Sequence, residues 1–150
     1  MAWLPAGFQH PGRLDLPSGH HLRPIRESDV DIDYPAVMGS RDRLWATYGE
    51  AWGWPPATMT AQQDRDDLAH HEREMVEGLS FNYAVLDEQE QALLGCLYID
   101  PPPEDEEADA VVSWWVVDDA VGSPLERALD EGVPRWLAEE WPFAEIRYGV

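Results

Sequence analysis

Two acidic residues near the end of a predicted strand are candidates for acid–base chemistry. Asp100 follows an apolar run that ends at Ile99, and Glu104 comes shortly after it. A carboxylate placed there could accept the proton of an attacking amine through one water molecule. The segment from Asp100 to Asp109 carries six acidic residues, so a solvated acidic loop is the alternative interpretation.

The histidines and the cysteine give no metal-ligand pattern. His20-His21 and His70-His71 are adjacent pairs, whereas two ligands on one helix face must lie about one turn apart. The single cysteine, Cys96, lies in an apolar run and allows neither an intramolecular disulfide nor a cysteine-based zinc site. We therefore predict no metal site and a buried, unreactive thiol.

The charge of the chain excludes several partners and mechanisms. Acidic residues number 30 and basic residues 10, which gives a formal charge of −20 that repels a phosphate backbone, so nucleic acid is not an expected partner. All the basic residues are arginine, so a lysine nucleophile or Schiff base is excluded. A hydrophobic fraction of 44% in 150 residues is enough for one domain with a core.

The N-terminal segment indicates the compartment. Residues 1–8 have no basic region and no long apolar stretch, so we expect neither a signal peptide nor a membrane anchor. The expected protein is soluble and cytoplasmic. Prolines and glycines recur throughout residues 1–19, which predicts an irregular arm, although Trp3, Leu4 and Phe8 could pin it onto the domain that follows over 20–150.

The first half of the domain is predicted to contain one strand and two helices. His21 to Arg26 reads as a short strand whose proline confines it to a sheet edge or a strand end. A helix follows from Glu27 to Leu44, and the aromatic segment from Trp45 to Pro56 is predicted to be a loop that could line a substrate cleft. A capping box at 60–63 opens a second helix that ends at Gly78.

The second half of the domain is predicted to contain three strands, a helix and a last strand. Residues 81–86 and 92–99 are predicted strands of an antiparallel hairpin, and the apolar run 110–117 is a third strand covered on both faces, with Trp114 and Trp115 filling the core on either side. Ser123, Pro124 and Glu126 give the clearest helix start, with Ser123 as the N-cap and Glu126 returning the capping bond. Residues 144–150 form a last strand parallel to 110–117.

The predicted fold is therefore α+β: a strand, two helices, three antiparallel strands, a helix and a parallel strand. This order, together with the segment Leu22-Arg23-Pro24-Ile25-Arg26-Glu27-Ser28-Asp29, resembles the GNAT acetyltransferase superfamily over about residues 20–150. The resemblance implies a mixed sheet in which the strands 110–117 and 144–150 splay apart. It also implies that acetyl-CoA lies in the gap, with its pantetheine arm on Trp115, Val116 and Val117.

The family places the pyrophosphate of the cofactor on amides at the start of the next helix. The resemblance assigns this role to Val121, Gly122 and Ser123. Val121 replaces the arginine or glutamine of the family loop, Pro124 replaces its second glycine, and Glu126 replaces its last small residue. Proline has no amide to offer and a carboxylate repels a diphosphate, so we expect weak or absent acetyl-CoA binding.

The resemblance also suggests a catalytic acid and two functions. Tyr148 could return a proton to the CoA thiolate, with Asp100 as the base for the amine; packing on the sheet is the alternative role for Tyr148. Members of the family often continue beyond the strand matching 144–150, so we expect a homodimer, or the N-terminal arm, to cover that strand's edge. The chain is expected to be an N-acyltransferase that uses acetyl-CoA and a small amine, or a GNAT-like binding or dimerisation module without acyl transfer.

Overall fold

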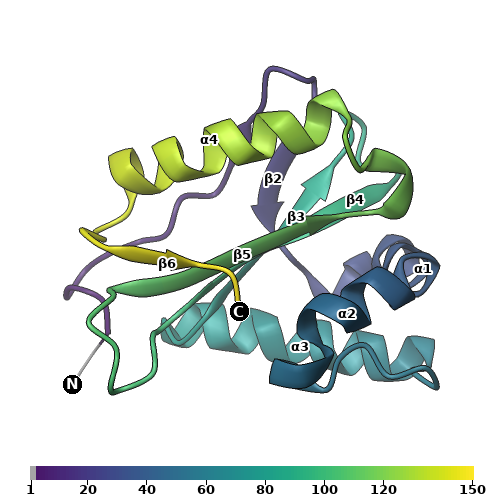
Figure 1. The fold of residues 1–150 in the computed structure, drawn as a ribbon, viewed down its shortest axis with the longest axis horizontal. Coiled ribbons are helices and arrows are strands. Elements are labelled where there is room, and N and C mark those ends of the chain that lie inside the picture. Colours follow the sequence, from purple (N-terminus) through teal and green to yellow (C-terminus); the bar gives the residue numbers. More distant parts are fainter. Residues whose placement is uncertain (1–2) are drawn as a thin grey trace.

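The computed structural model describes residues 3–150. A six-stranded sheet with the order β1-β2-β3-β4-β5-β6 has α4 on one face and α1, α2 and α3 on the other (Figure 1). Every neighbouring pair is antiparallel except β5 and β6, which are parallel. The predicted α+β architecture and its parallel crossover are therefore confirmed.

The N-terminal arm is not wholly irregular. Leu14–Asp15 form a short strand, β1, which pairs with β2 (His21–Pro24) and contributes the buried side chain of Leu16 just after it. Pro24 is the last residue of β2, which agrees with the expectation that a proline stands at a strand end.

The region after β2 differs most from the sequence prediction. A 3₁₀ turn at Glu27–Asp29 leads into α1 (Val30–Gly39), and a second helix, α2, runs from Arg41 to Trp52. The predictions of one helix to Leu44 and of a loop from Trp45 were therefore wrong. Trp45, Tyr48 and Trp52 recur at helical spacing, and Gly53 takes the left-handed conformation, φ 61°, that commonly ends a helix.

The middle of the chain follows its local signals closely. α3 spans Ala61–Glu77, begins with the predicted capping box between Thr60 and Gln63, and ends at Gly78. β3 (Phe81–Leu86) and β4 (Leu93–Asp100) form the predicted hairpin.

The last elements are β5 (Ala110–Val116), a 3₁₀ turn at Asp118–Ala120, α4 (Pro124–Glu140) and β6 (Ile146–Tyr148). The strand predicted over 144–150 is shorter, because the backbone amides of Ala144 and Glu145 donate to the Asp109 carboxylate instead of to a strand. The Ser123 hydroxyl caps α4 as predicted.

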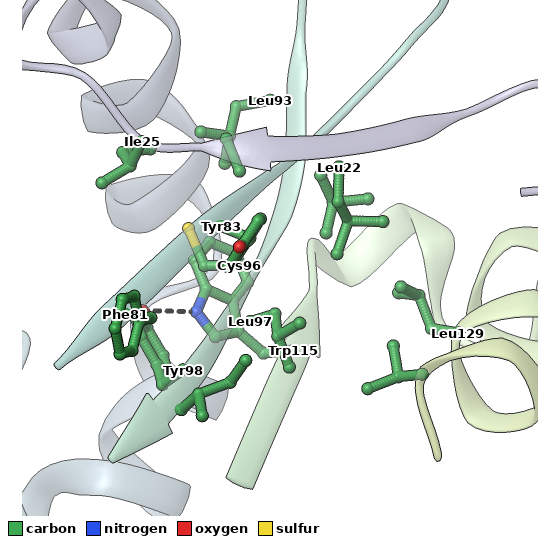
Figure 2. Close-up of a cluster of buried hydrophobic side chains, with 14 of the residues drawn as sticks. Leu22, Ile25, Phe81, Tyr83, Leu93, Cys96, Leu97, Tyr98, Trp115 and Leu129 are labelled. Atoms are coloured by element: carbon green, nitrogen blue, oxygen red, sulfur yellow. Dashed lines mark hydrogen bonds between the residues drawn. The ribbon is translucent and has the colours of Figure 1, made fainter. Parts of the chain in front are cut away.

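The core lies on both faces of the sheet. Tyr83 packs edge-on to Trp136 on the α4 side, and Leu97 and Leu129 also belong to the buried core. On the other face, the buried Trp115 donates its indole N–H to the hydroxyl of Tyr98 at 2.8 Å (Figure 2). The thiol of Cys96 is buried as expected, and burial raises its pKa. No helix within residues 3–150 is long and apolar enough to cross a bilayer.

The N-terminal arm packs near the start of β5 and leaves β6 uncovered. The Trp3 indole donates to the carbonyl of Asp109 at 2.8 Å and stacks on Phe143, while Phe8 packs on Trp141. Tyr148 remains 47% exposed. The expectation that the arm covers the last strand was therefore wrong. Its aromatic residues pack instead on Trp141 and Phe143, just after the end of α4.

Candidate functional site

A cavity of about 640 Å³ lies on the face of the sheet that carries α1, α2 and α3. Its floor comes from the sheet. Asn82 on β3 pairs with Tyr98 on β4, and Asp100, two residues further along β4, pairs with Val111 on β5. α3 and the end of α2 supply its walls. The cavity thus lies beside β5, the strand that precedes the parallel crossover.

α3 presents a polar stripe to this cavity. Asp64, Asp67, His71 and Glu74 all line it, and their spacing of three and four residues places them on one helix face. The Glu74 carboxylate lies 3.6 Å from Nδ1 of His71. Burial lowers the pKa of His71 and favours the neutral imidazole, although Glu74 and Asp67 act in the opposite direction.

Two buried carboxyl groups meet at the inner end of the cavity. Asp33 on α1 is 3% exposed and Asp64 is 2% exposed. Burial, together with a hydrogen bond to Asp64, raises the pKa of Asp33 well above its usual range, and burial also raises the pKa of Asp64. Burial therefore favours the protonated form of Asp33, and the Cys96 thiol donates to its carboxyl oxygen at 3.9 Å.

Two acceptor atoms in the cavity wall have no hydrogen-bond partner in the part of the chain that the structure describes. They are Oδ2 of Asp64 and Oδ1 of Asn82, and both side chains are more than nine-tenths buried. Buried acceptors are normally satisfied, because leaving one unpaired costs free energy. The wall is therefore short of donors at this point.

Aromatic rings also line the cavity. Trp52 and Trp54 line the cavity with Tyr98, and the Trp52 and Tyr98 rings meet edge to face at 5.2 Å. Tyr48 stacks behind Trp52 at 4.5 Å. The expectation that the aromatics of residues 45–56 could line a cleft thus holds for Trp52 and Trp54, although Trp52 belongs to a helix.

The structure separates the two predicted catalytic residues. Asp100 lines the cavity, accepts a hydrogen bond from the Ser80 hydroxyl, and has a pKa raised by burial. Tyr148 pairs in register with Val112 and packs edge-on to Trp114, whose indole bonds to Asp130 of α4, so it lies on the other face of the sheet. Burial raises the pKa of Tyr148. Glu104 is exposed and does not line the cavity.

β5 extends beyond its pairing with β6. The last registered pair is Val112 with Tyr148, followed by the bond from Gly149 N–H to the Val112 carbonyl, whereas β5 continues to Val116. Backbone groups alternate sides along a strand, so Trp114 and Val116 point their N–H and C=O groups toward the side on which Val112 pairs with β6. Within residues 3–150, β6 pairs with β5 only as far as Val112.

Of the three β5 residues predicted to bind the cofactor, Val116 is the one whose amide faces this open side. The Val117 amide, just after β5, donates to the Leu94 carbonyl at 2.9 Å. Trp115 is two residues away from Val117, so its backbone groups also face β4. The Trp115 side chain faces the cavity side of the sheet and is buried beneath Trp54, which lies 6.4 Å away.

Arg43 of α2 holds the end of β5. Its two terminal nitrogens both donate to the Val116 carbonyl at 3.2 Å, and its guanidinium also forms an ion pair with Asp118. The Asp118 amide donates to the Ser40 hydroxyl at 2.9 Å. The Val116 carbonyl is therefore occupied, and the start of α2 fixes the position of the Val116 amide.

The predicted phosphate-binding residues at the start of α4 are occupied by the chain itself. The amides of Val121 and Ser123 donate to the carbonyls of Asp118 and Ala120, at 3.2 and 3.1 Å. The Gly122 amide donates to the Glu126 carboxylate at 2.9 Å. Glu126 was expected to return its bond to Ser123, and the structure moves that bond one residue earlier.

A diphosphate does not fit this helix start. Pro124 has no amide, and the Glu126 carboxylate already takes the place of an anion on Gly122. At the end of β5, the Val116 carbonyl is occupied by Arg43, and the Val116 amide is the group that an extended amide chain would pair with. The start of α4 therefore does not fit the diphosphate of acetyl-CoA.

Several residues of the site were missed by sequence reasoning. Asp33, Asp64, Asn82 and Arg43 come from separate elements, and each looks like an ordinary surface residue in its local sequence. Asp64 and Asp67 lie in a run of charged residues on α3, where the local sequence favours a solvent-exposed position. The stripe of acids at helical spacing could have identified them, since it continues the apolar face through Leu68.

Comparison with known proteins supports the fold. No model of a protein family matches the sequence, and no curated protein matches it. Among solved structures, ribosomal-protein-S5-alanine acetyltransferase from Vibrio fischeri is similar with TM-score 0.64 and 16% identity, over 84% of this chain and 67% of that one.

Two further structures agree. An acetyltransferase from Salmonella typhimurium that modifies the N-terminal serine of ribosomal protein L7/L12 has TM-score 0.67 and 14% identity over 91% of this chain and 72% of its own. Mycobacterium smegmatis RimJ, in complex with a CoA-disulfide, has TM-score 0.59 and 19% identity over 93% of this chain and 69% of its own. The chain therefore has the fold of the GNAT superfamily.

Proposed function

We propose that this GNAT-fold chain is an N-acyltransferase that transfers an acyl group from a CoA-type thioester to an amine. The observation that carries the proposal is the acidic cavity on one face of a sheet whose strand β5 leaves the Val116 amide without a strand partner within residues 3–150. The solved structures of the same fold are acetyltransferases, and the RimJ structure holds a CoA-disulfide.

The amide of Val116 is the group that would orient the thioester. It faces the open side of β5, and Arg43 donates to the carbonyl of the same residue on that side. A positioned amide stabilises the oxyanion that develops when an amine attacks a carbonyl, because it donates a hydrogen bond where charge appears. This role requires no covalent intermediate on the chain.

The cavity would receive the amine and remove its proton. Asp100 lies in the wall, and burial raises its pKa toward the range in which a carboxylate accepts protons effectively. Asp64 and Asp67 would hold the ammonium form before it loses a proton. Tyr148, on the other face of the sheet, stays a sequence-based candidate for the acid that protonates the departing thiolate.

A second candidate function is a binding module that has lost acyl transfer. The hydrogen bond between Glu126 and Gly122 favours it, because this bond occupies an amide that the family uses for phosphate. Both candidates share the amine-binding cavity. They differ in whether the open edge of β5 accepts a thioester.

Release of free thiol from acetyl-CoA in the presence of a panel of amines tests the first candidate. Since the helix start does not fit a diphosphate, the assay needs acetyl-CoA near the millimolar range, where binding of about −4 kcal/mol suffices. We expect amine-dependent thiol release that is lost in Asp100→Asn and kept in Glu104→Gln, an exposed acid of the same loop. Absence of amine-dependent release at any donor concentration would favour the binding module.

A further inference from the structure

We propose that the cavity is a recognition site for a linear polyamine, held by the acidic stripe of α3 and by aromatic rings. The inference deepens the proposed function, since it names the class of amine and rests on the assignment of this cavity to the acceptor. Three features of the cavity support it: the acidic lining, two acceptor atoms without donors, and the length of the acidic stripe on α3.

Charge is the first argument. Asp64, Asp67, Glu74 and Asp100 line the cavity together with Asp33, whose raised pKa favours its neutral form. Two basic residues lie in its wall: His71, whose pKa is lowered by burial, and Arg147, which forms an ion pair with Glu106. Carboxylates in a partly buried wall are costly unless a cation compensates them. Within residues 3–150 the lining provides no free cation, so the ligand must bring positive charge.

The unpaired acceptors are the second argument. Oδ2 of Asp64 and Oδ1 of Asn82 both need donors, and neither finds one among residues 3–150. An ammonium group supplies three N–H donors and no acceptor. A ligand that carried carboxylate or phosphate at this place would leave both atoms unpaired and would add like charge.

Length is the third argument. Asp64 and Glu74 are ten residues apart on α3. With a rise of 1.5 Å per residue, the stripe therefore extends about 15 Å along the cavity. One ammonium group can reach only one end of it. Several ammonium groups on one chain can reach Asp64, Asp67 and Glu74 together.

The aromatic wall completes the match. Methylene groups between the charges would pack on Trp52, Trp54 and Tyr98, and ammonium groups near these ring faces gain a cation–π attraction. A flexible apolar chain with charges at intervals satisfies both walls at once. Linear polyamines have this structure.

Titration calorimetry of the full chain without any acyl donor tests the inference. Spermidine is the probe, n-butylamine supplies one charge on a similar chain, and 1,8-octanediol supplies the chain without charge. We expect spermidine to bind at least about tenfold tighter than n-butylamine, and octanediol not to bind measurably. Equal binding of spermidine and n-butylamine, or no binding of spermidine, would overturn the inference.

Matched variants locate the site. Asp64→Asn should weaken spermidine binding about tenfold or more, whereas Asp66→Asn should leave it within about twofold. Asp66 is exposed on the same helix and bonds to Gln62, so both variants lose the same charge. Asp67→Asn serves as a second variant if Asp64→Asn does not fold. Equal loss in Asp64→Asn and Asp66→Asn would mean diffuse attraction to an acidic protein and would reject the site.

The outcome is separable from that of the acyl-transfer assay. Thiol release with other amines but no spermidine binding would reject the polyamine and leave the acyltransferase. Tighter binding of a peptide with a free N-terminal amine than of spermidine would also reject the polyamine. Spermidine binding without thiol release would support this inference under the second candidate function.

Discussion

Glu126 places a carboxylate on the Gly122 amide, at the position where a helix start would otherwise hold a phosphate. The bond satisfies an orphan amide of the first turn, so it stabilises α4. The same bond puts negative charge next to any incoming anion. A single residue thus decides between a self-capped helix and an anion site.

Replacing Glu126 by alanine should therefore improve acetyl-CoA binding. Removal of one solvent-screened carboxylate is worth about 1 kcal/mol, or about fivefold in Kd. Calorimetry measures the change, and Glu139→Ala at the other end of α4 is the control for lost charge. Adding Pro124→Ala, which restores an amide, should improve binding further. Unchanged binding in Glu126→Ala would mean that the phosphates do not approach this helix.

Asp33 gives the chain a distinct dependence of stability on pH. Its pKa is raised in the folded state, so the folded chain holds more protons than the unfolded chain once pH exceeds the unfolded pKa. Stability from this group is complete below the unfolded pKa and is lost as pH rises through the folded pKa. The isosteric Asp33→Asn keeps the contacts with Asp64 and Cys96 without this loss.

We therefore expect Asp33→Asn to become more stable than the unaltered chain as pH rises from about 5 to about 8. Thermal unfolding at several pH values measures the difference in Tm. Asp31→Asn replaces an exposed residue of the same helix, so its Tm should change with pH as the Tm of the unaltered chain does. A constant difference between Asp33→Asn and the unaltered chain over this range would contradict the buried-acid account.

At the scale of elements, the close approach of β4 and β5 depends on Gly95. A Cβ atom there would lie 2.0 Å from the Trp115 carbonyl oxygen. Gly95→Ala should destabilise the chain by about 3 kcal/mol or more, because backbone atoms cannot move aside cheaply. Gly39→Ala, where a Cβ atom meets nothing within 4 Å, should be neutral or stabilising. Chemical denaturation measures both, and equal stabilities would contradict the register of these strands.

Elements with complete local signals were predictable from the sequence. α3 has a capping box and a terminal glycine, and α4 has Ser123 followed by Pro124, so both begin where the sequence indicates. α2 was missed because two glycines and two prolines near its end outweighed the helical spacing of its aromatics. Gly49 lies inside this helix, with the Trp45 ring close to where a Cβ would lie.

The candidate site was only partly predictable for a different reason. Asp100 and the β5 strand follow from local patterns, and both border the cavity. The pair Asp33 and Asp64 exists only because α1 and α3 pack on the same sheet face, which no local spacing encodes. Tertiary packing converts separate surface-type acids into one buried group.

At the scale of the whole molecule, the exposed edge of β6 leads us to expect a homodimer. Tyr148 and Val150 are 47% and 44% exposed beside this edge. The net charge of −20 opposes self-association, so the dimer should strengthen as salt screens the charge. Light scattering at low and moderate salt measures this. A monomer at both salt concentrations would contradict the expectation.

The binding of two thioesters tests the central claim most directly. S-acetylpantetheine carries the arm that the open edge of β5 fits, and it lacks the diphosphate that the start of α4 does not fit. We predict that the unaltered chain binds S-acetylpantetheine and acetyl-CoA with Kd values within about threefold of each other by calorimetry. Acetyl-CoA binding more than about tenfold tighter would show that the phosphates are held, and absence of binding by both thioesters would contradict the assignment of the β5 edge.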